Sequence, residues 1–455
     1  MHLNTAAFAI VMYTTGPGIA KTLHCLALLV ILVLAGNTAF AQSASSDEYV
    51  IVGYQAEATD NPVAILAGQL ARGETRLAYQ EARGYLDALL EALNIDMNSQ
   101  VLVFSKTSLQ YQKISAATPR AVYFSEDTYI GWVQNSTLVE IATLDSKLGL
   151  VFYLFNNRPD PAQYVVRESQ RCLVCHDSNG TMGGGVPLLL AHSSVYSLNY
   201  DNLLNVTGDY NTSDTTPVQD RWGGWYVSGE HGDQPHLGNL LLPDKADLVR
   251  LDAFRRGNLR TLADQDLFDT SPYLAATSDI VALMVMEHQL TVQNQLTYVK
   301  FKAPAVLERV GHGEARNAMT WDALPERARL ALTHMLDNLV DDLLLVDAAQ
   351  FEDEIHGSPE FVAWFQAQGP SDDQGRSLRD LDLKRNLFAW PLSYLVYSPA
   401  MANLPGYARD YVFRQITAKL SNPRLSSRQW TRQWSARQRQ TALAILNSTL
   451  ASQSP

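Results

Sequence analysis

The sequence from Ala121 to Phe155 reads AVYFSEDTYIGWVQNSTLVEIATLDSKLGLVFYLF and is rich in β-branched and aromatic residues. These residue types favour strands, and the short polar segments between the apolar runs are typical of turns. With one run upstream, the region divides into five β-rich runs: Val101–Ser105, Ala121–Ser125, Tyr129–Val133, Val139–Ala142 and Leu148–Phe155. Consecutive short strands joined by polar turns predict an antiparallel meander.

Helical patterns flank this meander on both sides. Before it, apolar residues recur at helical spacing over residues 63–93, where Gly73 and Gly84 interrupt the pattern. From Ala246 onward the sequence contains six candidate helices: 246–256, 277–300, 324–347, 358–367, 407–420 and 428–450. The predicted fold class is therefore α+β, with an N-terminal helix and antiparallel meander, a loop-rich core and a mostly helical C-terminal half.

The pentad Cys172-Leu173-Val174-Cys175-His176 follows the meander and spells C-x-x-C-H. This spacing is typical of c-type haem attachment, in which each thiol adds to a haem vinyl group and the imidazole binds iron from the proximal side. A zinc site is an alternative, with His231 and His236 as the second ligand pair. A dithiol redox pair is another, but it has no need of the adjacent His176. One covalent haem c is the favoured prediction.

The first 41 residues resemble a secretory signal peptide. Lys21 is their only charged residue, an apolar run from Cys25 to Ala35 follows it, and Ala39-Phe40-Ala41 fits the cleavage pattern. The chain has three cysteines, so removal of this segment would leave only the two cysteines of the motif. The sequence therefore predicts a periplasmic or otherwise exported protein. No later segment is long and apolar enough to predict a membrane span.

The composition predicts a globular protein with a large core, since the chain has 455 residues of which 46% are hydrophobic. Its formal net charge of −12 disfavours nucleic acid and anionic membranes as partners. A redox partner protein or a small-molecule electron donor or acceptor is compatible with this charge. The predicted organisation is a signal peptide at 1–41, an N-terminal α+β region at 42–160, a haem-binding core at 161–245 and a helical region at 246–455.

The block from Arg221 to Asn239, RWGGWYVSGEHGDQPHLGN, contains further candidates for the haem pocket. Trp222 and Trp225 could pack against the porphyrin or donate an indole N–H to a propionate, and Arg221 could form an ion pair with a propionate. Its glycines would let the backbone pass close to a flat ligand.

The second axial position of the iron has several candidates. His231 or His236 is the favoured distal ligand or distal catalytic base, because both lie in the irregular region after the motif. His288 and Met284 follow the predicted helix N-cap cluster at 277–279 and share a helix face that more often belongs to a core. His192 and Met182, which also follow the motif, complete the set of candidate ligands.

Together these features resemble the large single-haem c-type cytochrome domain of exported bacterial proteins. The matching stretches span most of the mature chain: Pro119–Phe124, Tyr129–Val133, Cys172–His176, Arg221–Asn239 and Tyr394–Pro399. The resemblance implies haem attachment at Cys172 and Cys175 and axial ligation by His176, and it implies no particular substrate. Electron transfer is the first predicted function. The alternative is a haem-dependent oxidoreductase of peroxidase- or oxidase-like type with a distal histidine.

Overall fold

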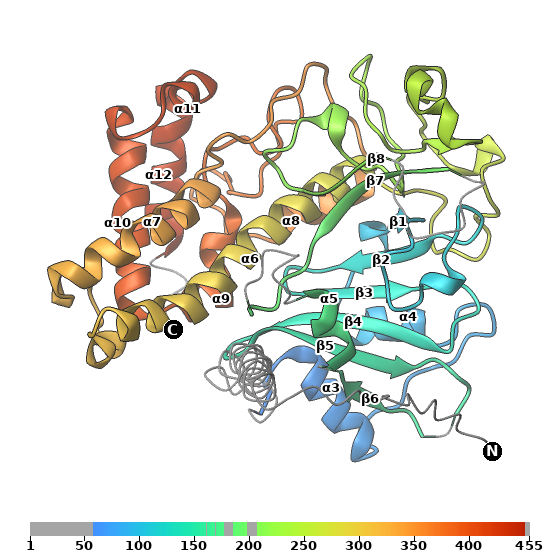
Figure 1. Ribbon diagram of the computed structural model, residues 1–455, viewed down its shortest axis with the longest axis horizontal. Coiled ribbons are helices and arrows are strands. Elements are labelled where there is room, and N and C mark those ends of the chain that lie inside the picture. The colour runs from blue at the N-terminus through green and yellow to red at the C-terminus, as the bar shows by residue number, and fades with distance from the viewer. Residues whose placement is uncertain (1–57, 161, 169, 177–184, 198–206, 451–455) are drawn as a thin grey trace, which may run out of the picture. The chain divides into compact units, whose positions relative to one another are not determined.

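The computed structural model describes residues 58–160, 162–168, 170–176, 185–197 and 207–450 (Figure 1). The predicted signal peptide and Met182 lie outside these residues. Within them, an antiparallel sheet occupies the N-terminal half and helices dominate the C-terminal half. This architecture confirms the predicted α+β fold class.

Seven strands form the main sheet, in the order β6-β5-β4-β3-β2-β1-β9, and every neighbouring pair is antiparallel. Five of them match the predicted runs: β1 (Val101–Val103), β2 (Arg120–Phe124), β3 (Thr128–Trp132), β4 (Leu138–Asp145) and β5 (Gly149–Asn156). The outer strands β6 (Val165–Arg167) and β9 (Trp225–Tyr226) were not predicted, because each is too short to give a periodic signal.

Strand β5 shows why the meander is readable from sequence. It reads GLVFYLFN, and every one of its residues is buried. A strand that is covered on both faces has a continuous apolar sequence. Part of that cover is α6 (Ile280–Arg309), which packs against β5 and crosses the molecule beside the sheet (Figure 1).

The motif lies on a short helix, α5 (Gln170–His176), which is drawn in front of β4 and β5 in Figure 1. A second, three-stranded sheet follows in the chain. Its strands are β7 (Ala191–Ser197), β8 (Thr207–Thr212) and β10 (Leu241–Leu242), and β7 lies between the other two. The β7–β8 pairing shifts register between Ser193 and Val195, which marks a bulge in this pair.

The remaining α-helices agree with the predicted ones in most positions. They are α3 (Pro62–Ala71), α4 (Leu86–Ala92), α7 (Glu326–Leu343), α8 (Pro359–Ala367), α9 (Pro399–Ala402), α10 (Gly406–Ser421), α11 (Arg428–Gln433) and α12 (Ala436–Leu450). No helix in the described ranges is long and apolar enough to cross a membrane.

Two predicted helices differ from the structure. The stretch predicted as a helix over 246–256 is a 3-10 helix, Lys245–Ala253, because the non-helical backbone of Arg250 (φ −130°, ψ 32°) interrupts it. The helix predicted over 428–450 is divided into α11 and α12. Ser435 makes the break, since its hydroxyl accepts the backbone N–H of Gln438 and starts a new helix.

Candidate functional site

A cavity of about 760 Å³ lies beside α5, and it is bordered by Cys172, Cys175 and His176 together. One wall is the face of the main sheet, to which β1, β2, β3, β4 and β5 contribute side chains. The other walls come from α5, from β7 and β8, from Trp225 of β9 and from α6. Ligand pockets in proteins typically enclose about 300–1,000 Å³, so this cavity has room for a large organic cofactor.

The two motif cysteines are both free thiols on α5. Residues three apart on a helix are neighbours on its surface, which puts both thiols on the side that borders the cavity. Burial, with a smaller contribution from Glu140 and Glu168, raises the pKa of Cys172 to about 12. The thiol of Cys172 is therefore protonated at neutral pH.

His176 has its ring orientation fixed by the backbone. Its Nδ1 donates to the Leu188 carbonyl oxygen at 2.7 Å, and the Leu188 N–H donates to the His176 carbonyl at 2.9 Å. The ring also packs against Phe152 of β5, with 4.7 Å between centroids. Among the described residues no group pairs with the other ring nitrogen, Nε2. Burial lowers the pKa of His176, although the Leu188 carbonyl opposes this, so its imidazole is in the neutral form that binds metals.

The cavity has a charged side at Arg120 of β2. The Arg120 guanidinium pairs with Glu140 of β4 at 2.7 Å, while its buried Nε has no partner within the part of the chain that the structure describes. Gly131 of β3 makes space for this guanidinium, since a Cβ there would lie 2.2 Å from Arg120 Nη2. Arg120 therefore keeps a spare donor for an acidic group.

Trp225 and His192 border the cavity next to one another. The indole Nε1 of Trp225 donates to the carbonyl oxygen of His192 at 2.7 Å, so this N–H holds the backbone of β7. The Nδ1 of His192 lies 3.3 Å from the hydroxyl of Ser194. Trp225 thus borders this cavity, where its packing face and not its N–H is available to a ligand.

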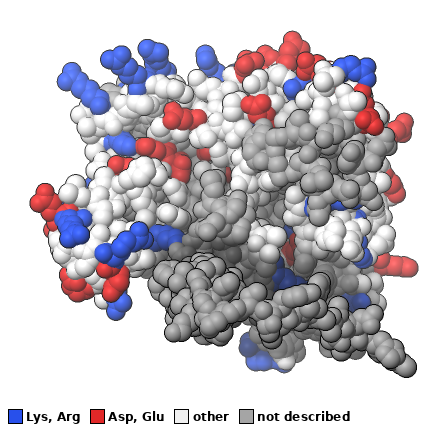
Figure 2. Space-filling model, in the orientation of Figure 1, with Lys and Arg blue, Asp and Glu red and all other residues white. Residues whose placement is uncertain are grey.

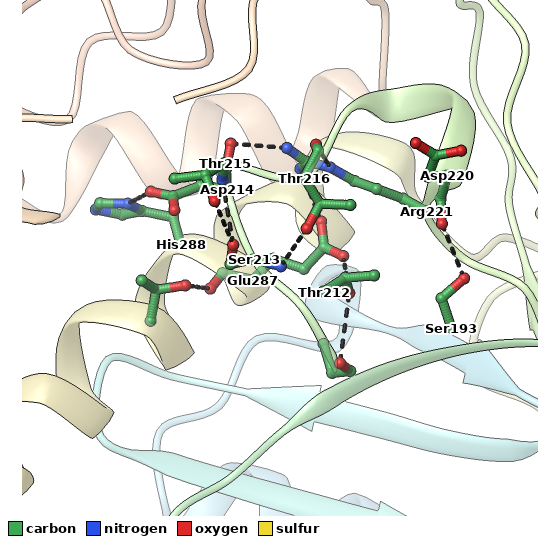
Figure 3. Close-up of polar contacts among 12 residues, drawn as sticks. Ser193, Thr212, Ser213, Asp214, Thr215, Thr216, Asp220, Arg221, Glu287 and His288 are labelled. Atoms are coloured by element: carbon green, nitrogen blue, oxygen red, sulfur yellow. Dashed lines mark hydrogen bonds and ion pairs between the residues drawn. The ribbon is translucent and has the colours of Figure 1, made fainter. Parts of the chain in front are cut away.

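Arg221 and Trp222 lie outside the set of residues that border the cavity. Arg221 forms a buried ion pair with Glu287 of α6 at 2.9 Å and donates to the carbonyl oxygens of Thr216 and Asp214, at 2.7 and 2.8 Å (Figure 3). Its guanidinium is thereby committed to the protein interior. Trp222 is 1% exposed and packs edge-on against His236.

His231 and His236 form a second buried pair, and neither borders the cavity. Their rings contact each other with 4.5 Å between centroids, and Nδ1 of His231 donates to the Gln234 carbonyl at 2.7 Å. Burial, with smaller contributions from His231 and Arg255, lowers the pKa of His236 to about 3. That His231 or His236 is the distal ligand or distal catalytic base stays a prediction, and their position away from the cavity does not favour it.

His288 uses both ring nitrogens within the core. Nδ1 lies 2.7 Å from Asp214 Oδ2 and Nε2 lies 2.8 Å from Ser393 Oγ (the Asp214 contact is drawn in Figure 3). The side chains of His288 and Ser393 are fully buried, and Ser393 caps the 3-10 helix Tyr394–Tyr397. The order Asp–His–Ser resembles a hydrolase triad, but this serine has no exposed surface to meet a substrate.

Helix α6 separates two environments. Met286 and Leu290 project toward the large cavity, while Met284 and His288 border a small cavity of about 20 Å³. Residues four apart share a helix face, so each pair lies on one side of α6.

Sequence reasoning did not single out Met286 or Arg120. Arg120 lies two residues before Val122, and alternate residues of a strand point to the same face of the sheet. Both border the cavity, so this spacing was the available signal for Arg120.

The zinc alternative needs four ligands at one point. In the described ranges, no group of three or more His, Cys, Asp or Glu side chains could hold a metal ion. The two cysteines border the large cavity, and His231 and His236 do not. The proposed second pair of zinc ligands is therefore not gathered with the first.

Comparisons of the chain with protein-family models, with curated proteins and with solved structures gave no match. Its function is therefore inferred from its own residues.

Proposed function

We propose that this chain is an exported c-type cytochrome that carries one covalent haem in the cavity beside α5 and transfers electrons. The observation that carries the proposal is that Cys172, Cys175 and His176 border one cavity of about 760 Å³, with Nδ1 of His176 already engaged by the Leu188 carbonyl. Metal-binding histidines commonly donate their second ring N–H to a carbonyl, which fixes the ring and strengthens the ligand.

The residues present fit the group. The two thiols can form thioether bonds to the vinyl groups, and His176 Nε2 can bind the iron. Apolar and aromatic side chains such as Phe152, Leu190 and Trp225 line the cavity and suit a porphyrin face. The unpartnered Nε of Arg120 suits a propionate.

When bound, haem supplies a one-electron redox couple. The chain would bind and orient it: α5 holds the attachment points, Leu188 fixes the His176 ring, and the sheet and α6 form walls of the cavity. Figure 2 shows basic and acidic side chains interspersed on one face of the molecule. With a net charge of −12, a basic redox protein and a small-molecule donor or acceptor both remain compatible partners.

The test is to produce the chain in a bacterium that exports it and attaches c-type haem. After denaturing electrophoresis, a haem stain should mark the wild-type band, and the double variant Cys172→Ala/Cys175→Ala should lose the stain. Val174→Ala is the matched control, because Val174 lies between the cysteines, is 72% exposed and should leave the stain unchanged. A wild-type protein that matures in this host without covalent haem would contradict the proposal.

Electron transfer is tested on the same preparation. The haem should reduce and reoxidise reversibly with small redox mediators, and peroxide should give no sustained turnover. Rapid peroxide turnover would favour the enzyme alternative in place of electron transfer.

A further inference from the structure

Few side chains at the cavity bind haem iron strongly. Histidine and methionine are the axial ligands of cytochromes c, and besides His176 the described residues place one of each at the cavity, His192 and Met286. His231, His236 and His288 do not. If the iron has a second ligand from the described residues, His192 and Met286 are therefore the candidates that the cavity itself offers.

A short described segment links His192 to Leu188, the residue that fixes the ring of His176. Leu188 is fixed to His176 by the two hydrogen bonds described above, and His192 follows only four residues later. Four residues span at most about 14 Å even when fully extended. Leu189 and Leu190, the residues before β7, border the same cavity, so the path from one imidazole to the other runs along its wall.

Hydrogen bonds from three other elements hold the backbone on either side of His192. Asn294 of α6 bonds both the N–H and the carbonyl of Leu189, at 3.1 and 2.6 Å. His192 then pairs with Asn211 of β8, and its carbonyl accepts the indole N–H of Trp225. A ligand on such a fixed backbone loses little conformational freedom when it binds.

The side chain of His192 repeats the pattern of His176. In each ring Nδ1 is near a protein oxygen, the Leu188 carbonyl for His176 and the Ser194 hydroxyl for His192, at 2.7 and 3.3 Å. A hydrogen bond at Nδ1 favours binding of a metal through Nε2. Met286, in contrast, is 3% exposed within a fully buried stretch of α6, where packing accounts for it.

We propose that His192 is the second axial ligand, which makes the haem bis-histidine and low-spin. This inference rests on the proposed function, because it needs the haem beside α5. Two histidine ligands give a lower reduction potential than a histidine and a methionine.

The experiment compares ferric electron paramagnetic resonance and visible spectra of the wild type, His192→Ala, His192→Met and Met286→Leu. The wild type should be low-spin and lack the methionine-to-iron charge-transfer band. His192→Ala should lose the low-spin signal, bind carbon monoxide when reduced, and regain low-spin character with added imidazole. His192→Met should be low-spin, show the methionine band and have a raised potential. Met286→Leu should match the wild type.

Three results would overturn this assignment: a wild-type haem that is already high-spin, a His192→Ala variant with an unchanged low-spin spectrum, or a methionine band that Met286→Leu removes. The wild-type spectrum alone decides between the ligand sets if His192→Ala fails to fold. A haem-stained band with unchanged variant spectra refutes only the role of His192. A wild-type band without stain refutes the proposed function as well.

Discussion

The molecule contains two histidine pairs whose surroundings differ sharply. His176 and His192 border a cavity of about 760 Å³, while His231 and His236 are buried against each other with ring centroids 4.5 Å apart. All four lie in the part of the chain that runs from α5 to the end of the Arg221–Asn239 block. Residue type and sequence position are therefore alike, and what separates the pairs is the space that the fold leaves beside each ring.

The direction of the pKa shift does not distinguish His176 from His236. Burial lowers the pKa of His176 and that of His236, the latter to about 3. A lowered pKa thus marks burial in both places, and it identifies a metal ligand only where a cavity and a hydrogen bond to Nδ1 accompany it. Both conditions hold at His176.

The largest expected effect is on the proposed haem. His176→Ala should remove the proximal ligand and abolish the native low-spin spectrum, or prevent stable haem incorporation, because among the described residues no other imidazole is held by Leu188. His236→Gln should leave the spectrum unchanged, since His236 does not border the cavity. Absorption spectra of both purified variants check this. The comparison fails if the spectrum is unchanged in His176→Ala or is altered in His236→Gln.

The next effect is on stability. Glu287→Gln removes one partner of a buried ion pair, whose side chains are 3% and 1% exposed, and leaves Arg221 charged in the core. Such a change costs about 3–5 kcal/mol in the free energy of unfolding. Urea unfolding measures it, and the haem spectrum of the folded variant should not move. Glu140→Gln, at the cavity, is the contrasting variant: the side chains of its ion pair are 23% and 16% exposed, so its loss should cost less than that of the Arg221–Glu287 pair.

The fold was largely predictable because its signals are local. The β-rich runs around β5 and the N-cap of α6 at Asp279, which accepts the Ala282 N–H at 2.8 Å, both appear in the sequence itself. Strand β9 was not predictable, because Trp225 and Tyr226 become a strand only by pairing with β1. Long-range pairing has no periodic signature in so short a segment.

The site was predictable on one side only. The C-x-x-C-H spacing predicts the thiols and His176 as one unit, and all three border the cavity. The Arg221–Asn239 block was expected to form the opposite wall, yet only its Trp225 does so. Arg221 instead pairs with Glu287, which is 66 residues away in the chain. Sequence alone could not supply that partner.

A smaller effect should follow from a substitution in the Arg221–Asn239 block that displaces the strand carrying His192. In Gly223→Ala the new Cβ would lie 2.8–2.9 Å from backbone atoms of Ser194, two residues after His192, so β7 must shift. Overpacking of this kind costs about 1–3 kcal/mol. Thermal unfolding should show the loss, and the haem spectrum should change with it. Gly257→Ala, which adds a Cβ with nothing within 4 Å, is the control and should change neither.

The last effect is a slope of stability with pH, which is spread over several pH units. An unperturbed histidine, as in the unfolded chain, has a pKa near 6.5, whereas the pKa of His236 in the folded protein is about 3. As the pH falls, the unfolded chain therefore binds the proton first. The contribution of His236 is complete above pH 6.5 and is lost progressively as the pH falls toward 3, by up to about 1.4 kcal/mol per unit. Urea unfolding between pH 7 and 5 should therefore show a steeper fall in the wild type than in His236→Gln. Equal slopes in the two proteins would mean that His236 is accessible to protons in the folded state. The contrast between the buried pair and the cavity pair would then lose its physical basis.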